Sequence, residues 1–168
     1  MSGEEAGTVD VWPGRQIAWR AFGDGPPLLL INGYAATGAD WDPAFLGALA
    51  ADHRVISPDN IGLGASALAD DDTVGGVEGM TADMVVLLDA LAIERTAIAG
   101  WSMGGFVAQS LVRAVPERVA SVGLISTHTG GSDCVNGSPE VARELVDHSG
   151  TPREQATRRT LRRSRPSL

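Results

Sequence analysis

Residues 96–108 read T-A-I-A-G-W-S-M-G-G-F-V-A, a pattern typical of a buried strand, a sharp turn and a helix in succession. It begins as an apolar run of strand length and ends as the start of a helical pattern that Pro116 stops. Between them, Gly100 to Gly104 match the pattern G-x-S-x-G. So sharp a turn strains the backbone of the serine and requires small residues two positions before and after it. The context predicts Ser102, with a positive φ, as a candidate nucleophile.

The predicted helix after Ser102 adds an electrostatic argument. Its free amides and the positive end of its dipole point toward the serine, so the backbone N–H of Met103 can face a developing oxyanion. The alternative is a glycine-rich turn with an incidental serine. The strand before the motif and the helix after it argue against that alternative.

Strands alternate with helices outward from this stretch. Strands are predicted at residues 8–12, 16–22, 28–31, 55–57, 96–99 and 119–126, the first two joined in a hairpin by Pro13-Gly14. Helices are predicted from Pro43 behind the N-cap Asp42, at 82–91 behind the N-cap Thr81, and at 103–115. Two more helix starts follow, at Ser138-Pro139 and Thr151-Pro152. This order predicts an α/β fold, with a mostly parallel sheet and helices on both faces.

Composition limits the function classes. The 168 residues, 43% of them hydrophobic, fit one domain with a real core. A net charge of −8 argues against nucleic-acid binding, although the only basic segment, 151–168, holds 6 arginines and one acid. No apolar run is long enough to cross a membrane, and residues 1–7 do not resemble a signal peptide. With Cys134 as the single cysteine, a cytoplasmic location is expected.

Three stretches together resemble the α/β-hydrolase family, over about residues 16–127. They are L-L-L-I-N-G-Y at 28–34, P-D-N-I-G-L-G-A-S at 58–66, and the G-x-S-x-G region at 100–105. The resemblance implies a serine hydrolase acting on an ester-like small molecule (an ester, lactone or thioester), with no cofactor and no metal. It also implies a core over 8–127 and a partial lid over 128–168 with an Arg-rich end.

The resemblance assigns a second oxyanion donor. In the family this backbone N–H belongs to the residue after a His-Gly pair, which maps onto Tyr34. Two positions depart from the family pattern, because Asn32 replaces the histidine and Ile61 replaces the arginine of D-x-R-G-x-G-x-S. Both departures are expected to affect how the loops of the site are held, without removing a catalytic group.

The acid and the histidine of the family's catalytic triad are not identified in this sequence. The triad runs in the order Ser, then Asp or Glu, then His, and the strands that carry the last two are not found before Leu168. A C-terminally truncated or frame-shifted member is therefore expected. The residues that follow Ser102 in nominal triad order are His128, Asp133 and His148, and the third histidine, His53, is expected at the opposite edge of the sheet. The alternative function is a catalytically inactive or small-molecule-binding fragment.

The sequence argues against a dinucleotide-binding site and against a metal site. Gly62 to Ala67 read G-x-G-x-x-A after a strand, as in dinucleotide-binding proteins, but a loop follows where that fingerprint needs a helix. The acidic run Asp70 to Asp72 is most simply a solvated loop, and no cluster of His or Cys suggests a metal site.

The last predicted strand has a consequence for assembly. Residues 119–125 are apolar, uncharged and free of proline, and no later strand is found to pair with them. An open edge of this kind invites pairing with another copy of the chain. Self-association through the sheet edge is therefore expected, unless the helices after Ser138 cover it.

Overall fold

The computed structural model describes residues 4–70, 72–132, 134, 137–140, 143 and 149. The chain divides into two units, Met1–Gly130 and Gly131–Leu168, and the first contains the sheet. In the second unit residues 139, 140 and 143 are helical, where Ser138-Pro139 predicts a helix start. The helix start at Thr151-Pro152, like Asp133 and His148, lies outside the described residues.

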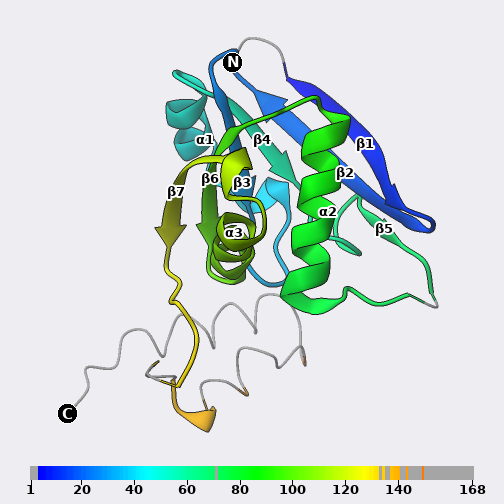
Figure 1. Cartoon of the computed structure of the whole chain (residues 1–168), viewed down its shortest axis with the longest axis vertical. Coiled ribbons are helices and arrows are strands. Elements are labelled where there is room, and N and C mark those ends of the chain that lie inside the picture. Colours follow the sequence, from blue (N-terminus) through cyan, green and yellow to red (C-terminus); the bar gives the residue numbers. More distant parts are fainter. Residues whose placement is uncertain are drawn as a thin grey trace. The chain divides into compact units, whose positions relative to one another are not determined.

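The first unit is built on a seven-stranded sheet in which only β2 runs against the other described strands (Figure 1). The strands are β1 (Glu5–Trp12), β2 (Arg15–Phe22), β3 (Pro27–Ile31), β4 (Arg54–Pro58), β5 (Ala67–Leu68), β6 (Thr96–Trp101) and β7 (Val119–Ile125). Their order is β1-β2-β4-β3-β6-β7, with β5 paired to β2. The mostly parallel sheet and its opening hairpin are confirmed.

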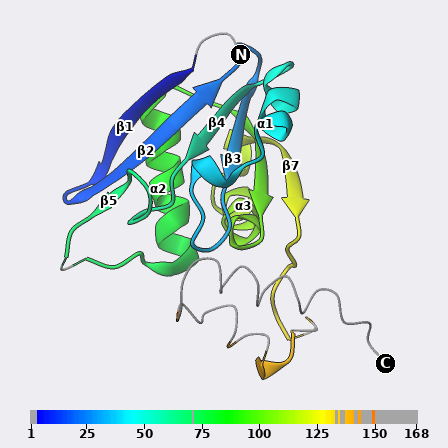
Figure 2. The ribbon, with the colours of Figure 1, turned by 180° about the vertical axis from the view of Figure 1, so that it is seen from behind.

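Helices pack on both faces of the sheet, as predicted. The helices α2 (Gly76–Ala90) and α3 (Met103–Ala114) lie in front of it in Figure 1, and α1 (Pro43–Ala50) lies on the other side, seen in Figure 2. Alternate residues of β3 supply the two cores: Leu29 packs with α2 and α3, whereas Leu30 packs with α1. The two cores fix β3 and β6 in the middle of the sheet, and their carboxyl ends carry the candidate site.

The predicted start of α2 is wrong. The helix begins at Gly76, behind Gly75 with φ 72°, and not at residue 82. Thr81 lies inside the helix, where its hydroxyl donates to the Val77 carbonyl at 2.7 Å. A helix that begins without a capping side chain gives no start signal in its sequence. The N-cap of α1 is confirmed, because the Asp42 carboxylate accepts the backbone N–H of Ala44 at 2.8 Å.

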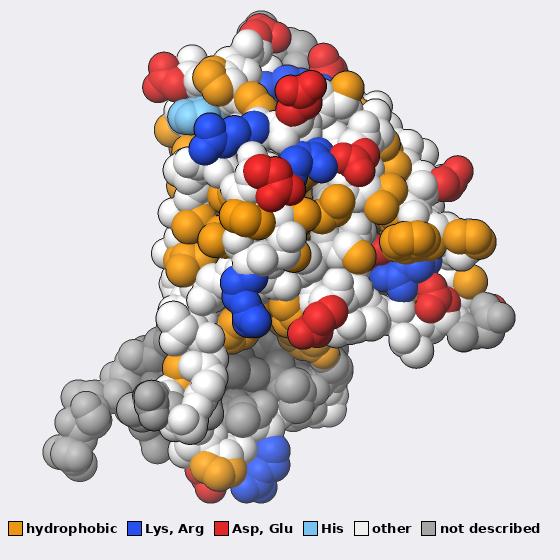
Figure 3. Space-filling model, in the orientation of Figure 1, with side chains coloured by type: hydrophobic (Ala, Val, Ile, Leu, Met, Phe, Trp, Pro, Cys, Tyr) orange, Lys and Arg blue, Asp and Glu red, His pale blue; other side chains and the backbone are white. Residues whose placement is uncertain are grey.

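Strand β7 is the least covered part of the sheet. Within the described residues it pairs with β6 alone. Its side chains Val122 and Leu124 are 42% and 45% exposed, and hydrophobic side chains gather over this strand in Figure 3.

No helix among the described residues is long and apolar enough to span a membrane.

Candidate active site

Ser102 lies on the turn between β6 and α3, with φ 52° and ψ −115°. Backbone bonds hold this strained conformation on both sides. The Ser102 N–H donates to the Ile125 carbonyl of β7, and the Gly105 N–H donates to the Ser102 carbonyl, both at 2.9 Å. The predicted position of Ser102, between strand and helix with a positive φ, is confirmed.

The glycines around Ser102 are required because backbone and side chains approach closely. A Cβ on Gly100 would collide with the Gly104 carbonyl oxygen, and a Cβ on Gly104 would lie 2.6 Å from the Asn32 carbonyl oxygen. A Cβ on Gly105 would lie 2.6 Å from the hydroxyl of Thr127. The N-terminal turn of α3 is thus wedged between the ends of β3 and β7, which presents Ser102 at the carboxyl edge of the sheet.

The loop after β3 also reaches the serine. A Cβ on Gly33 would lie 3.4 Å from the Ser102 Cβ and 3.1 Å from the Trp101 ring. The next residue, Tyr34, is 55% exposed, and Met103 is the first residue of α3. The structure therefore brings the loop that carries the Tyr34 N–H against Ser102, while the oxyanion roles of Tyr34 and Met103 stay predictions.

Backbone strain gathers at this edge. Four described residues other than glycine have positive φ values. Two of them directly follow parallel strands, Ser102 at 52° after β6 and Ser126 at 49° after β7, and a third, Ala35 at 53°, lies in the loop after β3. Each such conformation costs about 1–3 kcal/mol, and strain of this kind clusters at functional sites. The strain therefore singles out the same edge that the sequence motif does.

Residues 59–66 form a loop that braces the site. The Asp59 carboxylate accepts the backbone N–H groups of Gly38 and Ala65, at 2.8 and 2.9 Å. The Ser66 hydroxyl donates to the Asp59 carbonyl at 2.9 Å. Ile61, in place of the family's arginine, is 4% exposed and packs in the larger core. The loop is thus held by Asp59, Ser66 and apolar packing.

Two buried asparagines tie this loop to the loop after β3. Asn32, in place of the family's histidine, donates from Nδ2 to the Pro58 carbonyl at 2.6 Å. Asn60 donates from Nδ2 to the Gly33 carbonyl at 2.9 Å. The sequence pattern did not single out Asn60, because Asn60 occupies a variable position of D-x-R-G-x-G-x-S. Its signal in the sequence was an uncharged amide two residues after the end of a buried strand.

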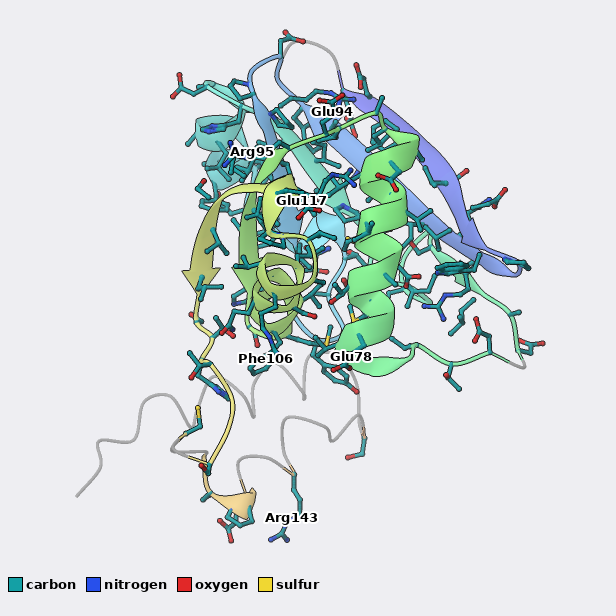
Figure 4. All side chains as sticks on the ribbon, viewed as in Figure 1. Glu78, Glu94, Arg95, Phe106, Glu117 and Arg143 are labelled. Atoms are coloured by element: carbon teal, nitrogen blue, oxygen red, sulfur yellow. The ribbon has the colours of Figure 1, made fainter. Side chains whose placement is uncertain are left out.

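The histidines do not complete a triad within the described residues. The His128 Nδ1 accepts the Gly130 N–H at 3.0 Å, so the neutral ring carries its proton on Nε2. Its ring packs on Phe106 of α3, at 4.9 Å between centroids, and Figure 4 shows Phe106 near the edge of the sheet where β6 and β7 end. His53 precedes β4 at the opposite edge, as predicted. No described carboxylate or imidazole hydrogen-bonds the Ser102 hydroxyl.

A separate charged cluster lies on the hairpin side of the sheet. Arg15 donates to the Asp83 carboxylate of α2 at 2.6 Å and to the Asp72 carboxylate at 3.1 Å. Burial raises the pKa of Asp83 and outweighs the opposing effect of Arg15. The Thr73 N–H, followed by Arg15, lowers the pKa of Asp72. Strands β4 and β3 separate β2 from β6, so this cluster is not part of the Ser102 site.

Two other features carry no site. Within the described residues, no group of His, Cys, Asp or Glu could hold a metal ion. A shallow hollow lined by Asp89, Ile93, Glu94 and Arg118 lies at the far edge from Ser102, the end where Figure 4 shows Glu94. The Arg118 side chain there is already bonded to the Asp89 carboxylate and to two backbone carbonyls.

Known proteins resemble this chain over the region that carries the site. A family model described as the alpha/beta hydrolase fold matches residues 26–151. The chain is 38% identical over 112 residues to a putative non-heme bromoperoxidase, BpoC, of Mycobacterium tuberculosis, covering 66% of this chain and 42% of that protein. It is 38% identical over 106 residues to the pimeloyl-(acyl-carrier protein) methyl ester esterase of Aeromonas hydrophila, covering 63% of this chain and 39% of that protein.

A solved structure agrees in fold. A hydrolase from Pseudomonas aeruginosa superposes with a TM-score of 0.73 at 27% identity, covering 99% of this chain and 64% of that one. The chain spans about two-fifths of the length of the two curated relatives. The matched region contains β3 to β7, and therefore Ser102 with the loops around it.

Proposed function

This chain belongs to the α/β-hydrolase fold family, and we propose that it carries the nucleophile and the oxyanion donors of a serine hydrolase acting on an ester-like small molecule. The observation that carries the proposal is the strained Ser102 at the N-terminus of α3, with the Gly33 loop in contact with it. An esterase among the relatives supports an ester as the substrate, and a lactone or thioester has the same reacting carbonyl group.

In the proposed reaction the Ser102 Oγ attacks the carbonyl carbon of the substrate and a base takes the hydroxyl proton. The carbonyl oxygen becomes an oxyanion, which accepts hydrogen bonds from the N–H groups of Met103 and Tyr34. The oxyanion collapses, the bond to the leaving group breaks, and the base returns the proton to the leaving group. Water then hydrolyses the acyl-enzyme, which releases the acid and restores the Ser102 hydroxyl. Preorganised donors of this kind are each worth about 10²–10³ in turnover.

The second candidate function is small-molecule binding without turnover, and it is supported by the hydrogen bonding of the Ser102 hydroxyl. Because no described histidine or carboxylate bonds to it, the 168-residue chain can be a small-molecule-binding fragment without turnover. Loss of a triad base costs about 10⁶ in turnover in a comparable enzyme. On this second reading, residues 1–168 hydrolyse activated aryl esters barely faster than the Ser102→Ala variant does.

The lid is a further part of the proposal. We propose that residues 8–127 form the catalytic core and that residues 128–168 begin a lid region. The division of the chain into two compact units after Gly130 supports this boundary.

Covalent labelling and turnover together test these proposals. A p-nitrophenyl alkylphosphonate should modify the chain once, at Ser102, and a Ser102→Ala variant should remain unmodified by intact mass. The matched control is Ser110→Ala, which removes another serine of α3 and should label like the parent chain. Labelling with robust ester turnover supports the hydrolase, and labelling without turnover supports the binding fragment. Absence of Ser102 labelling contradicts a nucleophilic role.

A further inference from the structure

Asn60 is a buried amide with no assigned role in the reaction. It is 3% exposed and lies two residues after the end of β4. Its Nδ2 donates to the Gly33 carbonyl at 2.9 Å and reaches the Ala36 carbonyl at 3.4 Å. Asp59 anchors the neighbouring backbone to Gly38 and Ala65. Asn60 therefore projects from a braced loop onto the loop that carries the Tyr34 N–H.

The hydrogen bond to Gly33 acts on the peptide unit that contains the proposed oxyanion donor. The Gly33 carbonyl and the Tyr34 N–H belong to one trans peptide, so they point to opposite sides of it. In the sheet order β4-β3-β6, the end of β3 lies between Asn60 after β4 and Ser102 after β6. Fixing the Gly33 oxygen on the Asn60 side therefore turns the Tyr34 N–H toward the Ser102 side.

This peptide needs an external anchor. Gly33 lacks a Cβ because Trp101 and Ser102 press against it, and glycine leaves the backbone free to rotate. The only other described bond to the Gly33 carbonyl is the long one, at 3.4 Å, from the Ala36 N–H. Asn32 donates in the reverse direction, from the β3 end to the Pro58 carbonyl. The two carboxamides thus make reciprocal hydrogen bonds between the two loops. Asn60 makes the bond that holds the Gly33–Tyr34 peptide.

We propose that Asn60 is a positioning residue that orients the Tyr34 N–H for the oxyanion. This inference rests on the proposed function, because it presupposes attack by Ser102. The described hydrogen bonds of the Asn60 side chain go to the Gly33 and Ala36 carbonyls and not to Ser102. Its contribution is to hold the peptide in place before the reaction, so that no reorganisation is needed when charge develops on the oxygen.

The test is the rate at which a p-nitrophenyl alkylphosphonate modifies Ser102 in the full 168-residue chain. The Ser102 Oγ bonds to phosphorus, p-nitrophenolate leaves, and the hydroxyl proton passes to solvent. Asn60→Ala should lower the limiting rate constant about 10–100-fold, less than the 10²–10³-fold loss of a whole donor. The reagent concentration for half-maximal rate should stay unchanged. An unchanged limiting rate overturns the inference.

Thr96→Val is the matched control. The Thr96 hydroxyl is also buried and also donates to a backbone carbonyl, that of Pro27 at 3.0 Å, but at the opposite end of β6. It should lose stability in denaturant as Asn60→Ala does, yet label at the parent rate. If both variants lose the same fraction of labelling rate, Asn60 acts only through stability and the inference fails.

Asn60→Asp separates orientation from folding even if Asn60→Ala does not fold. An ionised carboxylate has no proton to donate and repels the Gly33 carbonyl, whereas a protonated carboxyl can donate one hydrogen bond. The labelling rate of this variant, divided by the parent rate at the same pH, should therefore rise as the pH falls from 7 to about 5, because burial raises the pKa of a carboxyl. A flat ratio overturns the inference. If the parent chain itself is not modified at Ser102, the proposed function fails first.

Discussion

Two regions of the molecule bury polar side chains, and they do so with different chemistry. At the junction of the hairpin and α2, Arg15 forms an ion pair with Asp83, whose side chain is 1% exposed. At the carboxyl edge of the sheet, Asn32 and Asn60 bind backbone carbonyls with neutral amides. The charged region joins elements that are distant in sequence, β2 and α2. The neutral region sets the orientation of single peptides.

The ion pair is suited to joining β2 and α2, and the neutral carboxamides are suited to orienting peptides beside Ser102. A buried ion pair adds little net stability relative to apolar packing, but it is costly to break on one side. It therefore fixes which elements pair. A carboxamide donates without a net charge, so it can anchor a loop beside a reacting group without adding a charge that competes for the oxyanion. We expect substitutions in the first region to change stability alone, and those in the second to change stability less but also to change the reaction of Ser102.

The largest expected effect on stability is at the ion pair. Arg15→Met leaves Asp83 buried without its partner, and should lower the free energy of unfolding by about 3–5 kcal/mol. Urea denaturation followed by far-UV circular dichroism measures this. The double variant Arg15→Met with Asp83→Leu should be more stable than Arg15→Met alone. A double variant no more stable than Arg15→Met alone would contradict a cost from leaving Asp83 buried without its partner.

The next largest effect on stability is expected at the two buried asparagines, Asn32 and Asn60. Asn32→Leu removes the donor to the Pro58 carbonyl and leaves that buried acceptor unpaired, at a cost of about 1–3 kcal/mol. Part of the cost should be recovered, because the buried Asn32 Oδ1 has no described partner. The same denaturation experiment should therefore show a smaller loss than Arg15→Met does. A loss as large as that of Arg15→Met would remove the distinction between the two regions.

The two carboxylates of the charged region, Asp83 and Asp72, respond to pH in opposite ways. The folded pKa of Asp83 is raised above 3.8 by burial, so its contribution to stability is greatest at low pH and is lost as the pH rises through the folded value. The folded pKa of Asp72 is lowered, so its contribution is present above 3.8 and is lost as the pH falls through the folded value.

The two carboxylates therefore predict opposite slopes. Relative to Asp83→Asn, the parent chain should lose stability as the pH rises above about 4, a value set by the reference pKa of aspartate. Relative to Asp72→Asn, it should lose stability as the pH falls below that value. Denaturation at a series of pH values measures both differences. Slopes of the same sign would contradict the assigned effects of burial and hydrogen bonding.

The sequence predicted the parts of the fold that have a local signature. The apolar runs of β3 and β6 identify buried strands, and the glycines around Ser102 identify the sharp turn. The start of α2 escaped because Gly75 begins it without a capping side chain. Asn60 escaped because its role depends on the order of β4, β3 and β6, which places it beside Gly33. A sequence pattern records the spacing of residues along the chain, and it does not record which loop lies next to which.

The smallest and last expected effect concerns β7, which has neither kind of polar anchor. Its outer edge has no described partner, and Val122 and Leu124 are more than two-fifths exposed. We propose that two copies of the chain associate weakly through this edge, because unpaired backbone groups beside apolar side chains favour strand pairing. Sedimentation velocity should then show an average mass that rises with concentration.

A charge on the edge strand tests that proposal directly. Val122→Lys should shift the chain toward monomer, because pairing would bury an unpartnered ammonium group, and lysine is a common protection of edge strands. Val74→Lys is the matched control, since Val74 is also exposed, at 38%, but lies outside the strands. It should leave association unchanged. If both variants or neither becomes monomeric, association does not run through β7, and the edge is covered in another way.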